Sequence, residues 1–222
     1  MTEISSKEVN GQGDSDTKES SLWKEAWKRL LKNKIAMLGL TIISILVIVA
    51  IFAPVLAPYD PLKTDVIQRL KAPSGAHLLG TDDLGRDILS RIIYGSRISI
   101  QVGVISVSLA LVLGVTLGVL AGYYGGWIDN LVMRLIDIML AFPSILLAIV
   151  IMAMLGPQLS NAMIAIGFVN LPRFARIVRS SVLSVKEEEY VSAAQSLGSS
   201  DFRIITKHIL PNCLAPLTVQ ST

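Results

Sequence analysis

Residues 36–57 read AMLGLTIISILVIVAIFAPVLA and contain no charged side chain. A transmembrane helix needs about 20 mainly apolar residues to cross about 30 Å of hydrocarbon, so this run is long enough to span a membrane. Pro54 and Pro58 stand at its far end, where a helix can stop. The run lies too far from the N-terminus for an ordinary cleaved signal peptide, and we therefore expect it to remain as an anchor.

The composition of the whole chain agrees with a membrane protein. Of its 222 residues, 52% are hydrophobic and 17% are charged, and the mean hydropathy is +0.59. Soluble domains are nearer 45–50% apolar and about a quarter charged. A single cysteine, Cys213, excludes an internal disulfide, and only two histidines are present, so no Cys/His cluster for zinc exists. We expect an all-α polytopic helical bundle.

Three more apolar runs predict further spans. Residues 98–123 are uncharged, and residues 131–155 carry only Arg134 and Asp137, which are spaced to neutralise each other on a helix. Residues 158–178 form a weaker fourth run, because they contain asparagines, arginines and a proline.

A fifth apolar run begins at Pro211 and reaches Thr222 after 12 residues. A helix of that length is about 18 Å long at about 1.5 Å per residue, too short to cross a membrane. The sequence therefore predicts that the functional subunit continues beyond this point, with the chain truncated within its fifth span.

The runs divide the chain into four expected regions. Residues 1–21 are polar and predict a disordered tail. Residues 22–57 combine a basic amphipathic segment, either an interfacial helix or a plain juxtamembrane tail, with the first span. Residues 58–97 form a loop with a short helix, and residues 98–222 form the core domain with spans two to five.

Lysine and arginine predict the orientation, because these residues gather on the cytoplasmic side of short membrane loops. With a cytoplasmic N-terminus, fourteen of the 20 lysines and arginines lie inside and six lie outside. The opposite orientation would reverse the bias. Residues 58–97 are therefore expected outside, and residues 180–208 inside.

Residues 187–212 read EEEYVSAAQSLGSSDFRIITKHILPN, a polar stretch between two apolar runs. Its acidic start suits the positive end of a helix, and Gly198 stands where a helix C-terminus favours a left-handed residue. A second helix follows until Pro211 ends it, with one apolar face made by Phe202, Ile205 and Ile209. The pattern predicts a helix, a bend and a helix, either docking another subunit or packing only on its own protein.

This stretch resembles the EAA loop of bacterial ABC-importer permease subunits. The family pattern is Glu-Ala-Ala, three residues, Gly, nine residues, then Ile, any residue, Leu-Pro. Ser192 stands where the family has Glu, so Glu188 or Glu189 is an alternative carboxylate, and the ending His-Ile-Leu-Pro-Asn is similar to the peptide-permease branch. The resemblance implies contact with an ATPase for Glu188, Glu189, Ser192, Ala193, Ala194, Gly198, Asp201, Phe202, Ile205, Leu210 and Pro211.

Residues 77–100, HLLGTDDLGRDILSRIIYGSRISI, resemble the segment between the first two spans of C-type oligopeptide and dipeptide permease subunits. The residues themselves predict a short amphipathic helix capped by Thr81. A calcium site is disfavoured, because the aspartates lack the alternating spacing of an EF-hand. The resemblance, which covers about residues 22–222, implies docking of a substrate-binding protein on Asp82, Asp83, Arg86 and Asp87.

Prolines within two apolar runs mark interrupted helices. Broken backbone at membrane depth is tolerated only inside protein or beside a water-filled cavity. Candidates for lining a transport path are therefore Pro143, Asn170 and Pro172. In residues 98–123, glycines at every fourth position predict close approach of another helix of this subunit or of a sister subunit, at Gly114, Gly118 and Gly122.

The resemblance implies a permease subunit of an ATP-driven importer in the bacterial cytoplasmic membrane. Its partners would be a homologous second permease subunit, two cytoplasmic ABC ATPases, an extracytoplasmic substrate-binding protein and membrane lipid, with no nucleic acid. The chain contains no Gly-Lys pair and so no Walker A loop. We therefore expect no catalytic residue, metal or cofactor in this chain, with ATP and Mg²⁺ used by the partner ATPases.

Di- or oligopeptides are the cargo that the resemblance favours, with nickel or another small solute as an alternative. A channel or secondary transporter working without ATP is a different class of function, as is a membrane scaffold that transports nothing. Co-purification of an ATPase would separate the first reading from these two.

Overall fold

The computed structural model describes residues 31–213, 217–218 and 220, and these divide between Ile93 and Tyr94 into two compact units. The predicted tail, and most of the predicted interfacial helix, lie outside the described residues. Each unit is considered by itself.

The first unit contains the helix predicted from the opening apolar run. Helix α2, Lys34–Ile51, begins at Asn33, whose side-chain oxygen accepts hydrogen bonds from the amides of Ile35 and Ala36. This is the capping that helix N-termini need, because their first N–H groups have no partner within the helix. Of the residues in α2, only Ala50 is buried, so an apolar surface covers nearly the whole helix. Helix α3, Ala53–Leu56, and the short 3₁₀ helix η1, Val66–Gln68, follow it.

Helix α4 runs from Ile88 to Tyr124 without a break, over 37 residues. The prediction of a separate short helix capped by Thr81, and of a loop lasting to residue 97, is wrong. Thr81 instead forms an antiparallel bridge with Asp87, and α4 begins directly after that bridge. The apolar periodicity read as a short helix is thus the first part of one long helix.

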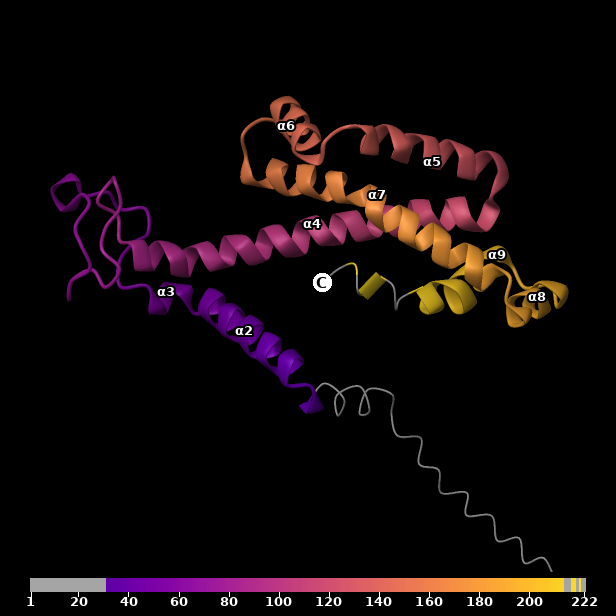
Figure 1. The fold of residues 1–222 in the computed structure, drawn as a ribbon, viewed down its shortest axis with the longest axis horizontal. Coiled ribbons are helices and arrows are strands. Elements are labelled where there is room, and N and C mark those ends of the chain that lie inside the picture. Colours follow the sequence, from indigo (N-terminus) through magenta and orange to yellow (C-terminus); the bar gives the residue numbers. More distant parts are fainter. Residues whose placement is uncertain (1–30, 214–216, 219, 221–222) are drawn as a thin grey trace, which may run out of the picture. The chain divides into compact units, whose positions relative to one another are not determined.

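The second unit also contains helices α5, Gly126–Ala141, α6, Ser144–Leu155, and α7, Leu159–Lys186 (Figure 1). Its remaining elements are α8, Glu189–Ser196, α9, Asp201–Ile204, the π-helix η2, Ile205–Ile209, and the 3₁₀ helix η3, Leu210–Cys213. Helix α7 is central, since it packs against α4, α5, α6 and η3.

Glycines on α4 allow α7 to approach closely, as their spacing predicted. A Cβ atom added at Gly114 would lie 2.5 Å from Cβ of Phe174, and one at Gly118 would lie 2.6 Å from the carbonyl oxygen of Ala175. A Cβ at Gly122 would lie 2.8 Å from Cβ of Val182. The partner of this glycine face is therefore α7 of the same subunit.

Among the described residues, α2 and α4 are long and apolar enough to cross a membrane. The predicted third span is broken at Pro143, as expected, and its two halves, α5 and α6, meet at an angle of 97°. Helices α5 and α6 form a third membrane span only if the bent pair crosses the membrane as a single span. The predicted fourth span lies within α7, which is not among these helices.

Two details of the sequence-based prediction are wrong. Helix α7 is not interrupted at Pro172, which is buried inside a continuous helix; neighbouring helices support the backbone around such a proline. Asp137 does not pair with Arg134, one turn away on α5. Its carboxylate accepts a hydrogen bond from Nη2 of Arg176 on α7 at 2.6 Å.

Candidate functional site

The loop predicted to contact an ATPase forms two short helices around a glycine. Helix α7 ends at Lys186, α8 begins at Glu189, and α9 begins at Asp201. Gly198 lies between α8 and α9 with φ of +75°, which confirms the predicted left-handed conformation. Such a residue is nearly always glycine, because a side chain there approaches the backbone too closely. We call residues 187–213 the coupling loop.

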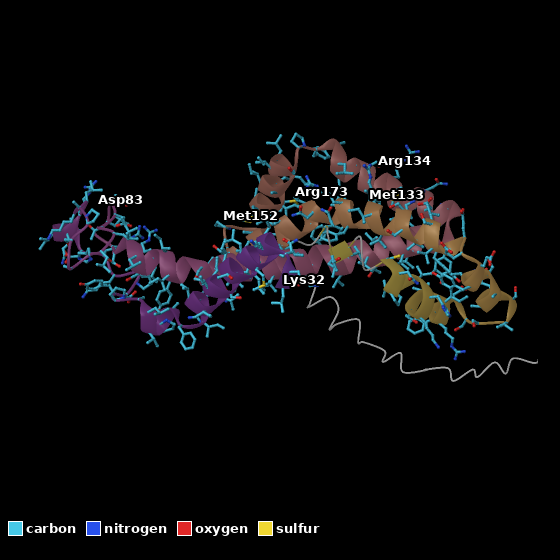
Figure 2. All side chains as sticks on the ribbon, turned by 60° about the horizontal axis from the view of Figure 1, so that its bottom comes forward. Lys32, Asp83, Met133, Arg134, Met152 and Arg173 are labelled. Carbon is cyan, nitrogen blue, oxygen red and sulfur yellow. The ribbon has the colours of Figure 1, made fainter. Side chains whose placement is uncertain are left out.

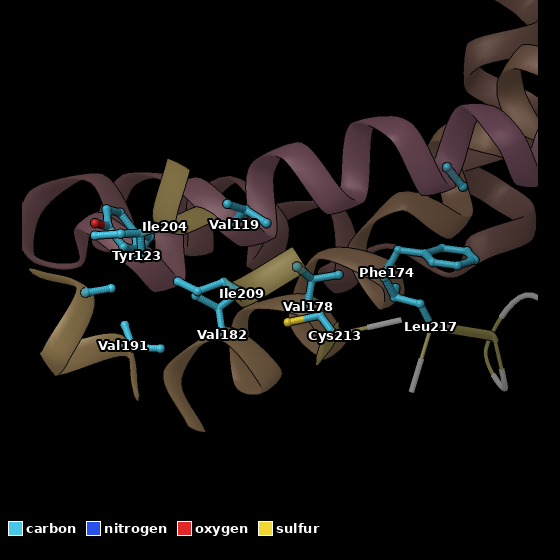
Figure 3. Close-up of a cluster of buried hydrophobic side chains, with 12 residues drawn as sticks. Val119, Tyr123, Phe174, Val178, Val182, Val191, Ile204, Ile209, Cys213 and Leu217 are labelled. Carbon is cyan, nitrogen blue, oxygen red and sulfur yellow. The ribbon is translucent and has the colours of Figure 1, made fainter. Parts of the chain in front are cut away.

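The inner side of the coupling loop is packed against the long helices α4 and α7. Buried side chains of Val191, Ala194, Ile204 and Ile209 join those of α4 and α7 in one apolar cluster (Figure 3). The members from α4 and α7 are Ala110, Val119, Tyr123, Phe174, Val178 and Val182. Apolar surface removed from water stabilises by about 25 cal/mol per Å², so this cluster holds the loop firmly on the two helices.

Two polar contacts reinforce this attachment. The Tyr123 hydroxyl at the end of α4 donates to Oδ1 of Asp201 at 2.7 Å. Lys186 Nζ donates to the Tyr123 carbonyl oxygen at 2.7 Å and lies 5.5 Å from the centre of its ring. Tyr123 thus joins the end of α4, the end of α7 and the start of α9. A force on the loop would be passed to both long helices.

The outer side of the coupling loop carries an exposed apolar tip. Leu197 is 86% exposed and Phe202 is 77% exposed, on either side of Gly198. Phe202, Ile205 and Ile209 were predicted to form one apolar face, and this is wrong, because Phe202 points away from the other two. Ile209 is fully buried, and Ile205 is half-buried against the apolar cluster. The helix widens into a π-helix at Ile205, which changes the spacing at which side chains return to one face.

The remaining predicted residues of the loop divide between its two sides. Exposed positions are Glu188, Glu189, Ser192, Ala193, Asp201 and Pro211, whereas Ala194 is buried and Leu210 is half-buried. Pro211 was expected to end the second helix. The chain instead passes from η2 directly into η3, which contains Pro211.

In the first unit, Asp82 organises the segment before α4. Its carboxylate accepts hydrogen bonds from the amides of Leu84 and Arg86, from Nε of Arg86 and from Nη1 of Arg91. Burial opposes ionisation of this carboxyl, but the hydrogen bonds outweigh it and lower its pKa to about 2. Two of the four residues proposed for docking, Asp82 and Arg86, are therefore already engaged with each other.

Asp87 is buried and holds His77. Its Oδ1 lies 3.0 Å from Nδ1 of His77, and its Oδ2 accepts from the amide and hydroxyl of Ser90. Burial raises and these hydrogen bonds lower the pKa of Asp87, with a net lowering. Nε2 of His77 lies 2.6 Å from Oε1 of Gln68. Asp87 is thus part of the internal structure, while Asp83 stays exposed at the surface (Figure 2).

Two of the predicted path-lining residues lie near a groove in the second unit. The groove has a volume of about 290 Å³ and is lined by Asn170 and Arg173 of α7 and by residues on both sides of the α5–α6 break. Pro143, at the break, is exposed, and the next residue, Ser144, lines the groove. Pro172 is buried and lies outside its lining.

Sequence reasoning missed four residues of these sites: Leu197, Tyr123, Lys186 and Ser144. Leu197 carried a signal in its position, directly before the glycine that was predicted to be left-handed. The other three take their roles from contacts with distant segments. In the described part of the chain, no group of three or more histidine, cysteine or acidic side chains could hold a metal ion.

The comparisons with known proteins agree with this architecture. Residues 114–221 match the family described as binding-protein-dependent transport system inner membrane component, and residues 21–73 match the N-terminal TM domain of oligopeptide transport permease C.

Similar proteins are bacterial permease proteins. The chain is 56% identical over 202 residues to a dipeptide transport system permease protein of Alkalihalophilus pseudofirmus, covering 91% of this chain and 66% of the relative. It is 45% identical to a protein of the same description from Haemophilus influenzae, covering 89% and 69% of the two chains. It is 43% identical to an oligopeptide transport system permease protein of Bacillus subtilis, covering 96% and 70%.

The chain thus spans about two thirds of the length of these relatives. The match extends through the membrane helices and the coupling loop, and the C-type N-terminal domain precedes them. The chain belongs to the family of binding-protein-dependent transport system inner membrane components.

Proposed function

We propose that this chain is the transmembrane permease subunit of an ATP-driven importer of di- and oligopeptides in the bacterial cytoplasmic membrane. It works with a second, homologous permease subunit, two cytoplasmic ABC ATPases and an extracytoplasmic substrate-binding protein. ATP and Mg²⁺ are used by the ATPases. The peptide cargo is supported by relatives described as dipeptide and oligopeptide transport permeases.

The coupling loop transmits the motion of the ATPases to the permease helices. Its tip, Leu197 and Phe202, presents exposed apolar surface that suits a groove on an ATPase subunit. Its base is held by the apolar cluster and by Tyr123, so the tip and the membrane helices move together. Closure of the ATPase dimer would shift the tip, and α4 and α7 would follow as one body. Alternating access of a central path then results from rotation of these helices.

The test compares apolar and polar positions of the same loop. Leu197→Asp and Phe202→Asp each place a charge in an apolar contact, which is strongly unfavourable when the charge is unpaired. Ser196→Asp is the matched control, since Ser196 is exposed on α8 and its hydroxyl donates only to the Ser192 carbonyl. The three variants are expressed with the partner subunits, and ATPase recovery and labelled-dipeptide uptake are measured from the same membranes.

We expect normal abundance in all three variants, with ATPase recovery and uptake lost only for Leu197→Asp and Phe202→Asp. Full ATPase recovery and uptake in both of these variants would mean that the loop is not the coupling element. Uptake that never depends on ATP or on the ATPases would contradict the proposed class of transporter.

A further inference from the structure

Three arginines lie along α7 at positions 173, 176 and 179. Arg179 donates to both carboxylate oxygens of Asp129, and Arg176 donates to Asp137 at 2.6 Å. Both acceptors lie on α5. The guanidinium of Arg173 has no hydrogen bond or ion pair to any residue that the structure describes, and its side chain is exposed.

Arg173 lacks an acidic partner among the described residues because α5 ends near this level of α7. This helix stops at Ala141, and the chain turns by 97° into α6. Residues 138–158 contain no acidic side chain, so α5 and α6 supply no third carboxylate. Where α5 would continue, the groove of about 290 Å³ opens beside Arg173 instead.

The groove combines an apolar lining with a few polar groups. Aliphatic side chains form most of it, from Leu140, Ile145, Ala148, Ile166 and Val169. The polar groups are the hydroxyl of Ser144, the amide of Asn170 and the guanidinium of Arg173. Nδ2 of Asn170 donates to the Ile166 carbonyl at 2.9 Å. Its side-chain oxygen therefore remains as an acceptor, while Ser144 and Arg173 provide donors.

We propose that Arg173 binds the C-terminal carboxylate of the peptide cargo as the peptide passes, with the Ser144 hydroxyl as a second donor. This inference rests on the proposed function. Arginine holds carboxylates through two parallel N–H···O bonds, which suits a terminal carboxylate common to all peptides whatever their side chains. The Asn170 oxygen can accept from the last peptide N–H. The aliphatic lining suits apolar side chains.

The position of Arg173 supports a transient ligand. It lies about midway along α7, about 20 Å from Lys186 at about 1.5 Å per residue. In the membrane span that the sequence predicts within α7, an ionised side chain at this level is costly unless it faces a cavity or a partner. The charges of Arg176 and Arg179 are neutralised by ion pairs with aspartates of α5. At Arg173 the anionic partner is instead the transported molecule, which binds only transiently.

The test uses the complete transporter, with both permeases, the ATPases and the binding protein, in proteoliposomes. Uptake of alanyl-alanine and of its C-terminal amide is measured for the parent, Arg173→Met, Arg173→Lys and Arg134→Met. Arg134 is the matched control, because it is an exposed arginine on α5 that has no ion pair within the described residues and does not line the groove (Figure 2). Any preference of the binding protein is the same for every variant and cancels in the comparison.

We expect Arg173→Met to reduce uptake of the free peptide about tenfold or more, the effect of losing charge-assisted hydrogen bonds, with little change for the amide. Arg173→Lys should retain part of the preference, since lysine keeps the charge but loses the bidentate geometry. Arg134→Met should behave as the parent. An unchanged preference in Arg173→Met, or an equal loss for both peptides, would overturn the inference; an equal loss would indicate a structural role or an acidic partner from the second permease.

A binding measurement separates this inference from the proposed function. In a Cys213→Ser background, Ile145→Cys, at an exposed apolar position of the groove lining, is alkylated in the assembled transporter with and without each peptide. Protection by alanyl-alanine but not by its amide, abolished by adding Arg173→Met, supports the inference; protection that ignores the carboxylate or Arg173 overturns it. If the parent takes up neither peptide, the peptide cargo is wrong, and this measurement still decides whether Arg173 binds carboxylates.

Discussion

The hydroxyl of Tyr123 and the carboxylate of Asp201 meet at 2.7 Å, although 78 positions separate them in the chain. Tyr123 is the last residue but one of the long helix α4, and Asp201 begins the second helix of the coupling loop. Lys186, at the end of α7, donates to the carbonyl of the same tyrosine, so Tyr123 connects α4, α7 and α9 by hydrogen bonds. The loop is therefore attached to the two long helices α4 and α7 by hydrogen bonds as well as by apolar packing.

Removing the Tyr123 hydroxyl should weaken the attachment of the coupling loop to α4. Tyr123→Phe is expected to lower the free energy of unfolding by about 1 kcal/mol, the net value of one hydrogen bond. Tyr124→Phe is the control, since Tyr124 is 48% exposed and its ring packs edge-on against Tyr123. A double-mutant cycle with Asp201→Asn, read from unfolding midpoints in detergent, measures the pair directly. A coupling energy near zero would show that the contact does not tie the loop.

The glycine face of α4 gives a second prediction. In Gly118→Ala the new methyl would lie 2.6 Å from the backbone oxygen of Ala175, so α4 and α7 must move apart. Forced overpacking of this kind costs about 1–3 kcal/mol.

Gly103→Ala is the matched control on the same helix, because nothing lies within 4 Å of its added Cβ. There we expect no loss, or a gain of up to about 1 kcal/mol from helix propensity. The thermal stability of the purified subunit distinguishes Gly118→Ala from Gly103→Ala. Equal stability of both variants would mean that the close contact of α4 and α7 does not exist in the membrane.

The segment before α4 should resist acid. The pKa of Asp82 is about 2, below its ordinary value of 3.8, so its contribution to stability is fully present above pH 3.8 and is lost as the pH falls toward 2. Asp87, whose pKa is also lowered, acts in the same direction.

Hydrogen exchange of residues 59–91 measures this acid resistance. Protection should persist to about pH 4 and decline below it. In Asp82→Asn, protection should already be weaker at neutral pH. Asp83→Asn, at an exposed position, should match the parent. Protection that disappears between pH 6 and 5 would instead assign the stability of this segment to another group.

Much of this architecture could be predicted from local patterns in the sequence. Uncharged runs predicted α2 and most of α4, the spacing of Gly114, Gly118 and Gly122 predicted a close helix contact, and a helix-ending pattern predicted the left-handed Gly198. Each of these patterns is read from residues that follow one another along the chain.

Other features depend on residues far apart in the chain. Arg134 and Asp137 have the spacing of a helical ion pair, but Arg176 lies closer to Asp137 once α5 and α7 pack together. Ile205 has the spacing of an apolar face shared with Phe202, but it lies half-buried against the cluster once the loop packs on α4 and α7. No local pattern indicates that Tyr123 meets Asp201.

The orientation of the chain remains a prediction from its lysines and arginines. Gly75, in the loop expected outside, and Ser196, in the coupling loop expected inside, are both exposed. Cysteines at these positions, in a Cys213→Ser background, should differ toward a membrane-impermeant thiol reagent added to intact cells. We expect labelling of Gly75→Cys alone, and of both variants once the cells are permeabilised. Labelling of Ser196→Cys alone in intact cells would invert the topology.

The bend at Gly198 gives the last prediction. Its φ is +75°, and no atom lies within 4 Å of an added Cβ, so any cost of a side chain comes from the backbone rather than from crowding. A residue with a side chain in this conformation loses about 1–2 kcal/mol, and a β-branched one is a marked outlier. Asparagine tolerates the left-handed region far better.

Gly198→Val and Gly198→Asn therefore form a matched pair that differs in backbone preference at one exposed site. The valine variant can escape strain by changing the bend, which re-aims Phe202 relative to Leu197. We expect it to reach normal abundance in the membrane, because the strain is small against insertion of the apolar helices. Its ATPase recovery and peptide uptake should nevertheless be strongly reduced. Gly198→Asn should keep most of both, because the bend is preserved. If the two variants transport equally well, the direction in which the bend aims the tip has no part in coupling, and apolar contact alone must account for ATPase binding.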